Sequence, residues 1–175
     1  MNSPSLPARN LDRAELQALV DELANHPERW GDHVAFSSPT RHFVSLHRDE
    51  YVDIWLLCWK RDDDTGWHDH DISSGAVRVV RGAVKESSPR MGGEPAVRIV
   101  PAGRSFSFGP EHIHRLAGEG REAISIHAYS PPLWRLGQYS IDSDGVMRRE
   151  SVSYADELRP LDGLTLQAIA PTPAV

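Results

Sequence analysis

The sequence predicts an all-β barrel or sandwich preceded by one α-helix. Three observations carry this prediction. Helical spacing of apolar residues is confined to the start of the chain, and from about residue 41 short apolar runs alternate with Gly, Pro, Asp and Ser. No repeat of about 20 to 50 residues is visible, which argues against a solenoid or a propeller. At 175 residues the chain fits one domain, so we expect a single domain over 1–175.

The helix is expected within an N-terminal helical segment, 10–30. Apolar residues there share one helical face, namely Leu11, Leu16, Leu19, Val20 and Leu23. Asn10 is the predicted N-cap, and the helix should end near residues 25–27, where a proline follows. Residues 1–9 and 168–175 are rich in proline or in alanine and proline, so we expect flexible ends.

The strands are predicted from apolar runs bounded by turn residues. These runs are 41–46, 51–59, 75–86, 96–100, 105–108, 123–129, 137–141 and 146–152. Residues 90–95 contain two glycines and are predicted to form a loop, and 142–145 a tight turn before the last strand.

Composition and net charge restrict the kinds of partner that the protein is expected to bind. The formal net charge is −6 and no Lys/Arg cluster occurs, which argues against a nucleic-acid or anionic-membrane partner and favours a small molecule. The longest apolar run, 54–59, is far shorter than the roughly 20 residues that span a bilayer. Residues 1–7 lack a signal-peptide pattern, so we expect a cytoplasmic protein. The single cysteine, Cys58, lies in an apolar run and is interpreted as a buried small hydrophobe.

A pair of histidines indicates a metal site. His68 and His70 flank Asp69, and because alternate side chains of a strand share a face, both imidazoles should point to one side. Their surroundings fit the first motif of the cupin fold, a jelly-roll or double-stranded β-helix barrel. Gly75 stands where many cupins carry a glutamate ligand, and Gly82 is the turn glycine. The glutamate ligand is therefore absent.

The third ligand has two candidates. The second cupin motif runs from a glycine through eleven positions to a histidine, and counting from Gly103 selects His114. His112 would share a strand face with His114, but the count assigns it to the loop that leads in. A surface pair or a hydrogen-bonded core pair is the alternative interpretation of these histidines. Three imidazoles suit Zn, Fe, Cu or Ni, so ligand chemistry alone does not select the metal.

Several separate blocks resemble the cysteine dioxygenase family of thiol dioxygenases, which are cupins. The resemblance covers about 40–132 and comprises Thr40-Arg41, Leu57-Cys58-Trp59, His68-Asp69-His70, Val80 to Gly82, Lys85-Glu86, His114-Arg115 and Ser125 to Pro132. It implies a cupin barrel with an N-terminal α-helix. It also implies an enzyme that uses Fe(II) and O2 to oxidise a small thiol, L-cysteine above all, to a sulfinic acid.

The same resemblance implies roles for individual residues. The iron ligands would be His68, His70 and His114. Ser125, His127 and Tyr129 would form a hydrogen-bonded row beside the iron, which agrees with three alternate residues of one strand sharing a face. Arg41 would bind the substrate carboxylate through its planar guanidinium. Without the resemblance, the row would be interpreted as ordinary polar neighbours on a half-buried strand.

Three departures accompany the resemblance. Pro39 stands where the family commonly has a tyrosine, and one extra residue separates Arg41 from the Leu-Cys-Trp block. Gly75 replaces the cysteine that cross-links to the tyrosine in the animal enzymes, so Tyr129 is expected to be unmodified. The resemblance also implies a cis peptide bond within 130–132, and X-Pro bonds are the ones that tolerate cis.

Other functions remain open at this point. The nearest is the same chemistry on another thiol, such as 3-mercaptopropionate, or on a pathway-specific substrate. A non-catalytic cupin that binds a metal or a metabolite belongs to a different class, and the positioned tyrosine argues against it. A zinc or nickel cupin that catalyses isomerisation or hydrolysis is a third alternative. The oligomeric state leaves no mark in the sequence, and no membrane partner is expected.

Overall fold

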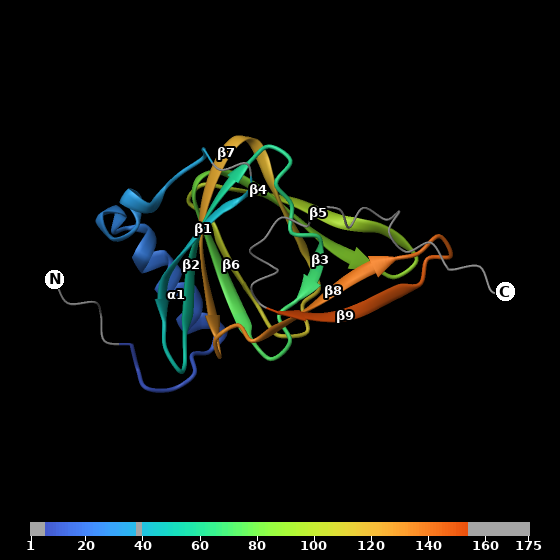
Figure 1. Cartoon of the computed structure of the whole chain (residues 1–175), viewed down its shortest axis with the longest axis horizontal. Helices are drawn as coiled ribbons and strands as arrows, with labels where there is room; N and C mark the ends of the chain where they lie inside the picture. Colours follow the sequence, from blue (N-terminus) through green and yellow to red (C-terminus); the bar gives the residue numbers. More distant parts are fainter. Residues whose placement is uncertain (1–5, 38–39, 154–175) are drawn as a thin grey trace.

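The computed structural model describes residues 6–37 and 40–153, so the predicted tail at 168–175, residues 1–5 and Pro39 lie outside the described residues. Most described residues lie in strands, and one α-helix lies near the N-terminus, which confirms the predicted fold class (Figure 1). The helical elements are α1 (Arg13–Ala24), η1 (Pro27–Arg29) and η2 (Gly31–His33). The strands are β1 (His42–Arg48), β2 (Asp53–Lys60), β3 (Trp67–Asp69), β4 (Ser74–Arg90), β5 (Gly93–Pro101), β6 (Ser105–Phe108), β7 (Arg115–Ser130), β8 (Arg135–Ile141) and β9 (Met147–Ser153).

The start of α1 differs from the prediction. The N-cap is Asp12 rather than Asn10, and the helix begins at Arg13. The Asp12 carboxylate accepts a hydrogen bond from the Glu15 amide at 2.9 Å, and the Glu15 carboxylate accepts one from the Asp12 amide at 2.9 Å. This capping box satisfies two amides that Asn10 would leave unpaired. Its sequence signal, Asp-x-x-Glu, outweighs the single polar residue two positions earlier.

The strands form two sheets. The larger has the order β1-β2-β7-β4-β5, with β6 also paired to β4, and the smaller has the order β3-β8-β9. In Figure 1, α1 lies beside the larger sheet, and β8 and β9 extend from the opposite side of the molecule. The pairs β2–β7 and β4–β7 are antiparallel, so β7 is central and carries neighbours along both edges.

The core consists of two apolar clusters on the two faces of β2. Trp55, Leu57 and Trp59 belong to the cluster between the sheets, whereas the alternate residues of β2 pack toward α1. Because successive side chains of a strand point to opposite faces, this apolar run is buried on both sides. Cys58 lies in the helix-side cluster, where burial raises the pKa of its thiol, in agreement with its predicted structural role.

Two predicted boundaries need correction and one turn is confirmed. The segment 90–95 is not a loop, because Arg90 pairs with Gly93 and only two residues turn the chain. Gly92 has φ +68°, which glycine adopts without strain, so a two-residue turn suffices here. β7 begins at Arg115, eight positions before its predicted start. The turn after Ile141 is present, and Ser130–Pro131 is a cis peptide bond, as expected.

Candidate metal centre

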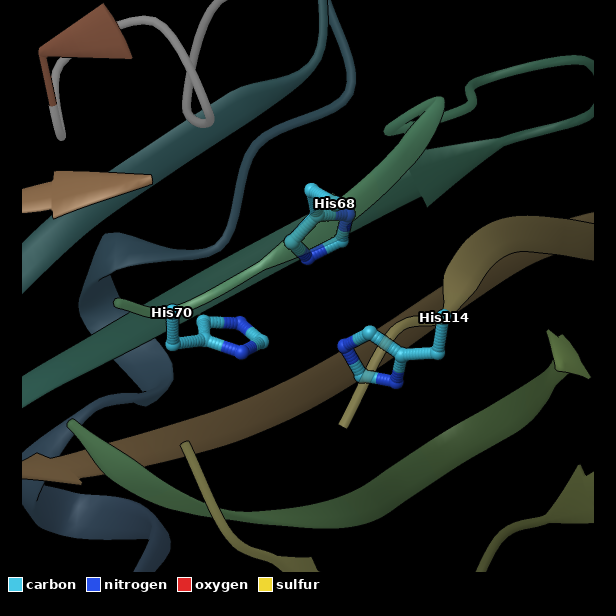
Figure 2. Close-up of side chains that lie close together, drawn as sticks. All are labelled: His68, His70 and His114. Carbon is cyan, nitrogen blue, oxygen red and sulfur yellow. The ribbon is translucent and has the colours of Figure 1, made fainter. Parts of the chain in front are cut away.

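The structure brings His68, His70 and His114 together. His68 lies in β3, His70 follows that strand directly, and His114 immediately precedes β7. A pair of backbone hydrogen bonds joins the two segments, from the His68 amide to the His114 carbonyl at 2.9 Å and in the reverse direction at 3.0 Å. The candidate ligand atoms of all three buried residues lie within 4.8 Å of one another. Figure 2 shows the three imidazoles turned toward a common centre.

Two of the imidazoles are oriented by hydrogen bonds at Nδ1. His68 Nδ1 donates to the carbonyl oxygen of Gly66 at 3.0 Å, and His114 Nδ1 donates to Glu86 Oε1 at 2.9 Å. Such bonds fix the tautomer in which Nε2 carries the lone pair, as in histidines that bind metals. The Nε2 atom of His114 is buried and has no hydrogen-bond partner among the described residues. A bound cation would satisfy it, so the donor set fits a metal ion.

Glu86 is a functional candidate that sequence reasoning missed. It lies on β4 with only 3% of its surface exposed, and it accepts hydrogen bonds from His114, His112 and Arg98. Burial acts to raise its pKa, but the hydrogen bonds from the two histidines and from Arg98 outweigh burial and hold the pKa well below its usual range. Glu86 is therefore a charged carboxylate that orients His114. In the sequence, Glu86 was noted only as part of the Lys85-Glu86 block that resembles the cysteine dioxygenase family, and no role was assigned to it.

His112 lies in the segment before His114, as predicted, and its Nε2 is 3.1 Å from Glu86 Oε1. Glu86, His112 and His114 are themselves close enough to form a second cluster of potential ligands. The Arg98 guanidinium already pairs with Glu86, and a cation there would be repelled by it. The cluster of His68, His70 and His114 is the better metal site.

Phe108 closes the side of the cluster next to Gly75. Its ring lies 4.7 Å from the His70 ring and 4.8 Å from the His114 ring, measured between centroids. A Cβ atom at Gly75 would lie 2.5 Å from Phe108 and 3.1 Å from Tyr129 Cδ1. Residue 75 therefore adjoins Tyr129, and Phe108 fills the space that a side chain from residue 75 would enter.

The predicted row on β7 is assembled. Ser125 Oγ lies 2.7 Å from His127 Nε2, and His127 Nδ1 lies 3.1 Å from the Tyr129 hydroxyl. All three residues are buried. The Tyr129 ring centroid is 5.1 Å from that of His70, so the row ends beside the histidine cluster.

Trp59 links the row to Arg41. Its indole Nε1 donates to Ser125 Oγ at 2.8 Å, and the Arg41 guanidinium carbon lies 4.8 Å from the centroid of its ring. Arg41 is 1% exposed, which is unusual for an arginine outside a binding site. Sequence reasoning identified Arg41 and Ser125 separately. It gave Trp59 no role, because the contact depends on the pairing of β2 with β7.

The strands and the buried histidine cluster define this protein as a cupin with a candidate metal centre. A solved structure of a conserved Klebsiella pneumoniae protein with a double-stranded β-helix domain superposes with a TM-score of 0.50 at 12% identity, covering 68% of this chain and 91% of that one. An oxalate oxidase in complex with the substrate analogue glycolate superposes with a TM-score of 0.50 at 15% identity, covering 62% of this chain and 60% of the other. At these identities the likeness concerns the fold alone.

The family assignment comes from sequence similarity. A model of the family "Cysteine dioxygenase type I" matches residues 6–142, and the chain belongs to that family. Cysteine dioxygenase type 1 of Bos taurus is 21% identical over 131 residues, covering 67% of this chain and 64% of the relative. The Danio rerio protein of the same name is 24% identical over 131 residues, with 67% and 65% covered. The chain thus spans slightly less than two thirds of these curated relatives. Within the described residues no helix is both long and apolar enough to cross a membrane.

Proposed function

We propose that this chain is an iron(II)-dependent thiol dioxygenase whose substrate is L-cysteine. The observation that carries the proposal is the hydrogen-bonded row ending in Tyr129 beside a buried cluster of three histidines. Membership of the cysteine dioxygenase type I family supports it. The overall reaction is R–SH + O2 → R–SO2H, in which both oxygen atoms enter the product and the thiol hydrogen becomes the sulfinic acid proton.

The donor set suits an anionic substrate. His68, His70 and His114 are neutral ligands, and Gly75 offers no carboxylate, so a bound divalent ion would keep its full charge. Iron(II) held there would supply a Lewis acid that lowers the pKa of a thiol and a reductant for O2. A thiolate that also carries a carboxylate matches this centre and the guanidinium of Arg41.

Arg41 is proposed to bind the substrate carboxylate. The planar guanidinium can form two parallel hydrogen bonds to a carboxylate, and burial strengthens them because little water competes. The face of Trp59 packs against this guanidinium and limits its orientations. A substrate held this way would have its thiol end free to reach the histidine cluster.

Tyr129 is proposed to form a hydrogen bond with the bound substrate and to relay the proton that the thiol releases: the phenol passes its own proton to His127 as it accepts the one from the thiol. His127 fixes the phenol at 3.1 Å, and Ser125 holds the other ring nitrogen of His127 at 2.7 Å. Because all three side chains are buried, water is largely excluded and the phenol stays in one orientation. A protein that only bound a metal would not need this arrangement.

The first test is anaerobic reconstitution with iron(II), followed by O2 uptake with L-cysteine and mass spectrometry of the product. We expect a mass gain of two oxygen atoms with the wild-type chain and none with His114→Ala. The matched control is His47→Ala, which removes a histidine that pairs with Asp49 and is not part of the histidine cluster, and it should retain turnover. Iron binding without oxidation of any thiol would refute the dioxygenase proposal and favour a binding cupin.

A thiol panel tests the substrate. L-Cysteine, 3-mercaptopropionate and cysteamine share the thiol but differ in the amine and the carboxylate, so their relative kcat/KM values report which group is recognised. Arg41→Met should lower kcat/KM for the two carboxylates by about 100-fold, since a bidentate charged pair is lost, and leave cysteamine unchanged. Faster turnover of 3-mercaptopropionate than of L-cysteine by the wild type would change the assigned substrate and keep the chemistry.

A further inference from the structure

The strand that carries His68 and leads directly to His70 is short and pairs with a hairpin that is distant in sequence. β3 has three residues, and apart from its backbone bridge to His114 it pairs with β8, through Trp67–Tyr139, His68–Gln138 and Asp69–Gly137. β8 in turn pairs only with β9 among the other described strands. All three residues of the strand that presents His68 and leads to His70 therefore pair with the β8–β9 hairpin.

Asp69 ties this strand to the hairpin. It stands between the two histidines, so its side chain points to the opposite face of the strand, toward β8 and β9. Its carboxylate accepts hydrogen bonds from Arg149 Nε at 2.8 Å, from an Arg149 terminal nitrogen at 3.0 Å and from the Tyr139 hydroxyl at 2.5 Å. The amides of Gly137 and Asp71 donate to it at 3.0 Å and 2.9 Å. Asp69 is only 6% exposed.

The hairpin is shaped around this carboxylate. A Cβ atom at position 137 would lie 2.5 Å from Asp69 Oδ2 and 2.6 Å from Arg149 Cζ, so a side chain there would displace the paired carboxylate and guanidinium. The contact is a charged, multiply hydrogen-bonded pair rather than a loose surface ion pair.

We propose that Asp69 and Arg149 are positioning residues, which lock β3 onto the β8–β9 hairpin and hold His68 and His70 in the geometry that binds the metal. This inference rests on the proposed metal centre. The hydrogen bonds of Arg149 go to Asp69 and Asp71 rather than to a histidine, so its effect on the metal would pass through these carboxylates and the strand. The hairpin thereby becomes part of the metal site although it contributes no ligand.

The test compares metal binding by Arg149→Leu and by Arg148→Leu in the full chain. Arg148 precedes Arg149 in β9, is exposed and pairs with Asp142 at 3.6 Å, so its replacement matches the change in charge and size without removing a partner of Asp69. Affinity for iron(II) is measured anaerobically by competition with a chelator, and the ligand field by the absorption spectrum of the cobalt(II)-loaded protein. We expect about 10- to 100-fold weaker binding and an altered cobalt spectrum for Arg149→Leu, since residues that orient metal ligands have effects of this size.

Two further variants keep the test decisive. Arg149→Lys retains the charge but not the planar guanidinium, so its metal affinity should lie between those of the wild type and Arg149→Leu. Tyr139→Phe removes one hydrogen bond to Asp69 and should weaken metal binding several-fold. If Arg149→Leu does not fold, as judged by circular dichroism, Tyr139→Phe decides the question. Lower thermal stability with wild-type affinity and spectrum would overturn the proposal, because a purely structural pair would behave in that way. Failure of the wild-type chain to bind either metal would instead refute the proposed function.

Discussion

The close approach of Phe108 to Gly75 predicts that a larger residue at position 75 destabilises the protein. Carbon atoms in contact lie about 3.5–4.0 Å apart, and a Cβ at residue 75 would lie 2.5 Å from the Phe108 ring, an overlap of about 1 Å. The ring cannot move easily, because it packs against His70 at 4.7 Å and His112 at 5.5 Å between centroids. Overpacking of this kind costs about 1–3 kcal/mol, so Gly75→Ala should lower the free energy of unfolding by that amount.

A double-mutant cycle isolates the contact. Phe108→Ala alone should cost about 3–5 kcal/mol, as for other buried aromatic residues. Adding Gly75→Ala to it should cost little more, because the obstructing ring is gone, and the coupling energy should be about 1–3 kcal/mol. Urea unfolding of metal-free protein measures each value without a contribution from bound ligand.

The control for this cycle is Gly93→Ala. Gly93 also lies in a strand, but a Cβ there meets no atom within 4 Å, so the change should stay within about 0.5 kcal/mol. If Gly75→Ala were as mild as Gly93→Ala, or if the two changes at the site were simply additive, Phe108 would not be the obstacle. The argument that this side of the metal centre is closed to a fourth protein ligand would then fail.

Three further predictions concern other contacts. In a chelator competition, Glu86→Gln should weaken iron(II) binding by about 10-fold or more. The reason is that one amide oxygen replaces a carboxylate that accepts hydrogen bonds from two imidazoles. Unchanged affinity would show that the carboxylate does not orient the site. Trp59→Phe removes the donor to Ser125 and should lower kcat more than it changes metal affinity, as steady-state O2 uptake would report. Asp12→Ala should cost about 1 kcal/mol in thermal or urea unfolding, whereas Asn10→Ala should cost nearly nothing; equal effects would contradict the assigned cap.

The sequence predicted the parts of the site that lie close together along the chain. Alternation along a strand is enough to put His68 and His70 on one side, and to line up Ser125, His127 and Tyr129. Alternation alone could not select His114, because His112 satisfies the same pattern. The spacing of the second cupin motif was needed to choose between the two histidines. The cis bond after Ser130 came from the resemblance rather than from physical reasoning on the residues.

The supporting residues could not be predicted because they come from the pairing of distant strands. Glu86 reaches His114 because β4 and β7 pair with Glu86 opposite Leu116, and nothing local specifies that register. Arg149 reaches Asp69 through two successive strand pairings across 80 positions. Such contacts are visible only once the sheets are assembled.

The two sheets position different candidate ligands of the proposed metal centre. His68 and His70 are held by the small sheet through Asp69, whereas His114 is held by the large sheet through Glu86. A pair of backbone hydrogen bonds between His68 and His114 links the two groups directly. Further bonds join the same two segments beside this pair, among them those between Thr65 and Leu116. A metal ion bound by all three histidines would add one more link between the sheets, so metal binding and the closure of the barrel should stabilise each other.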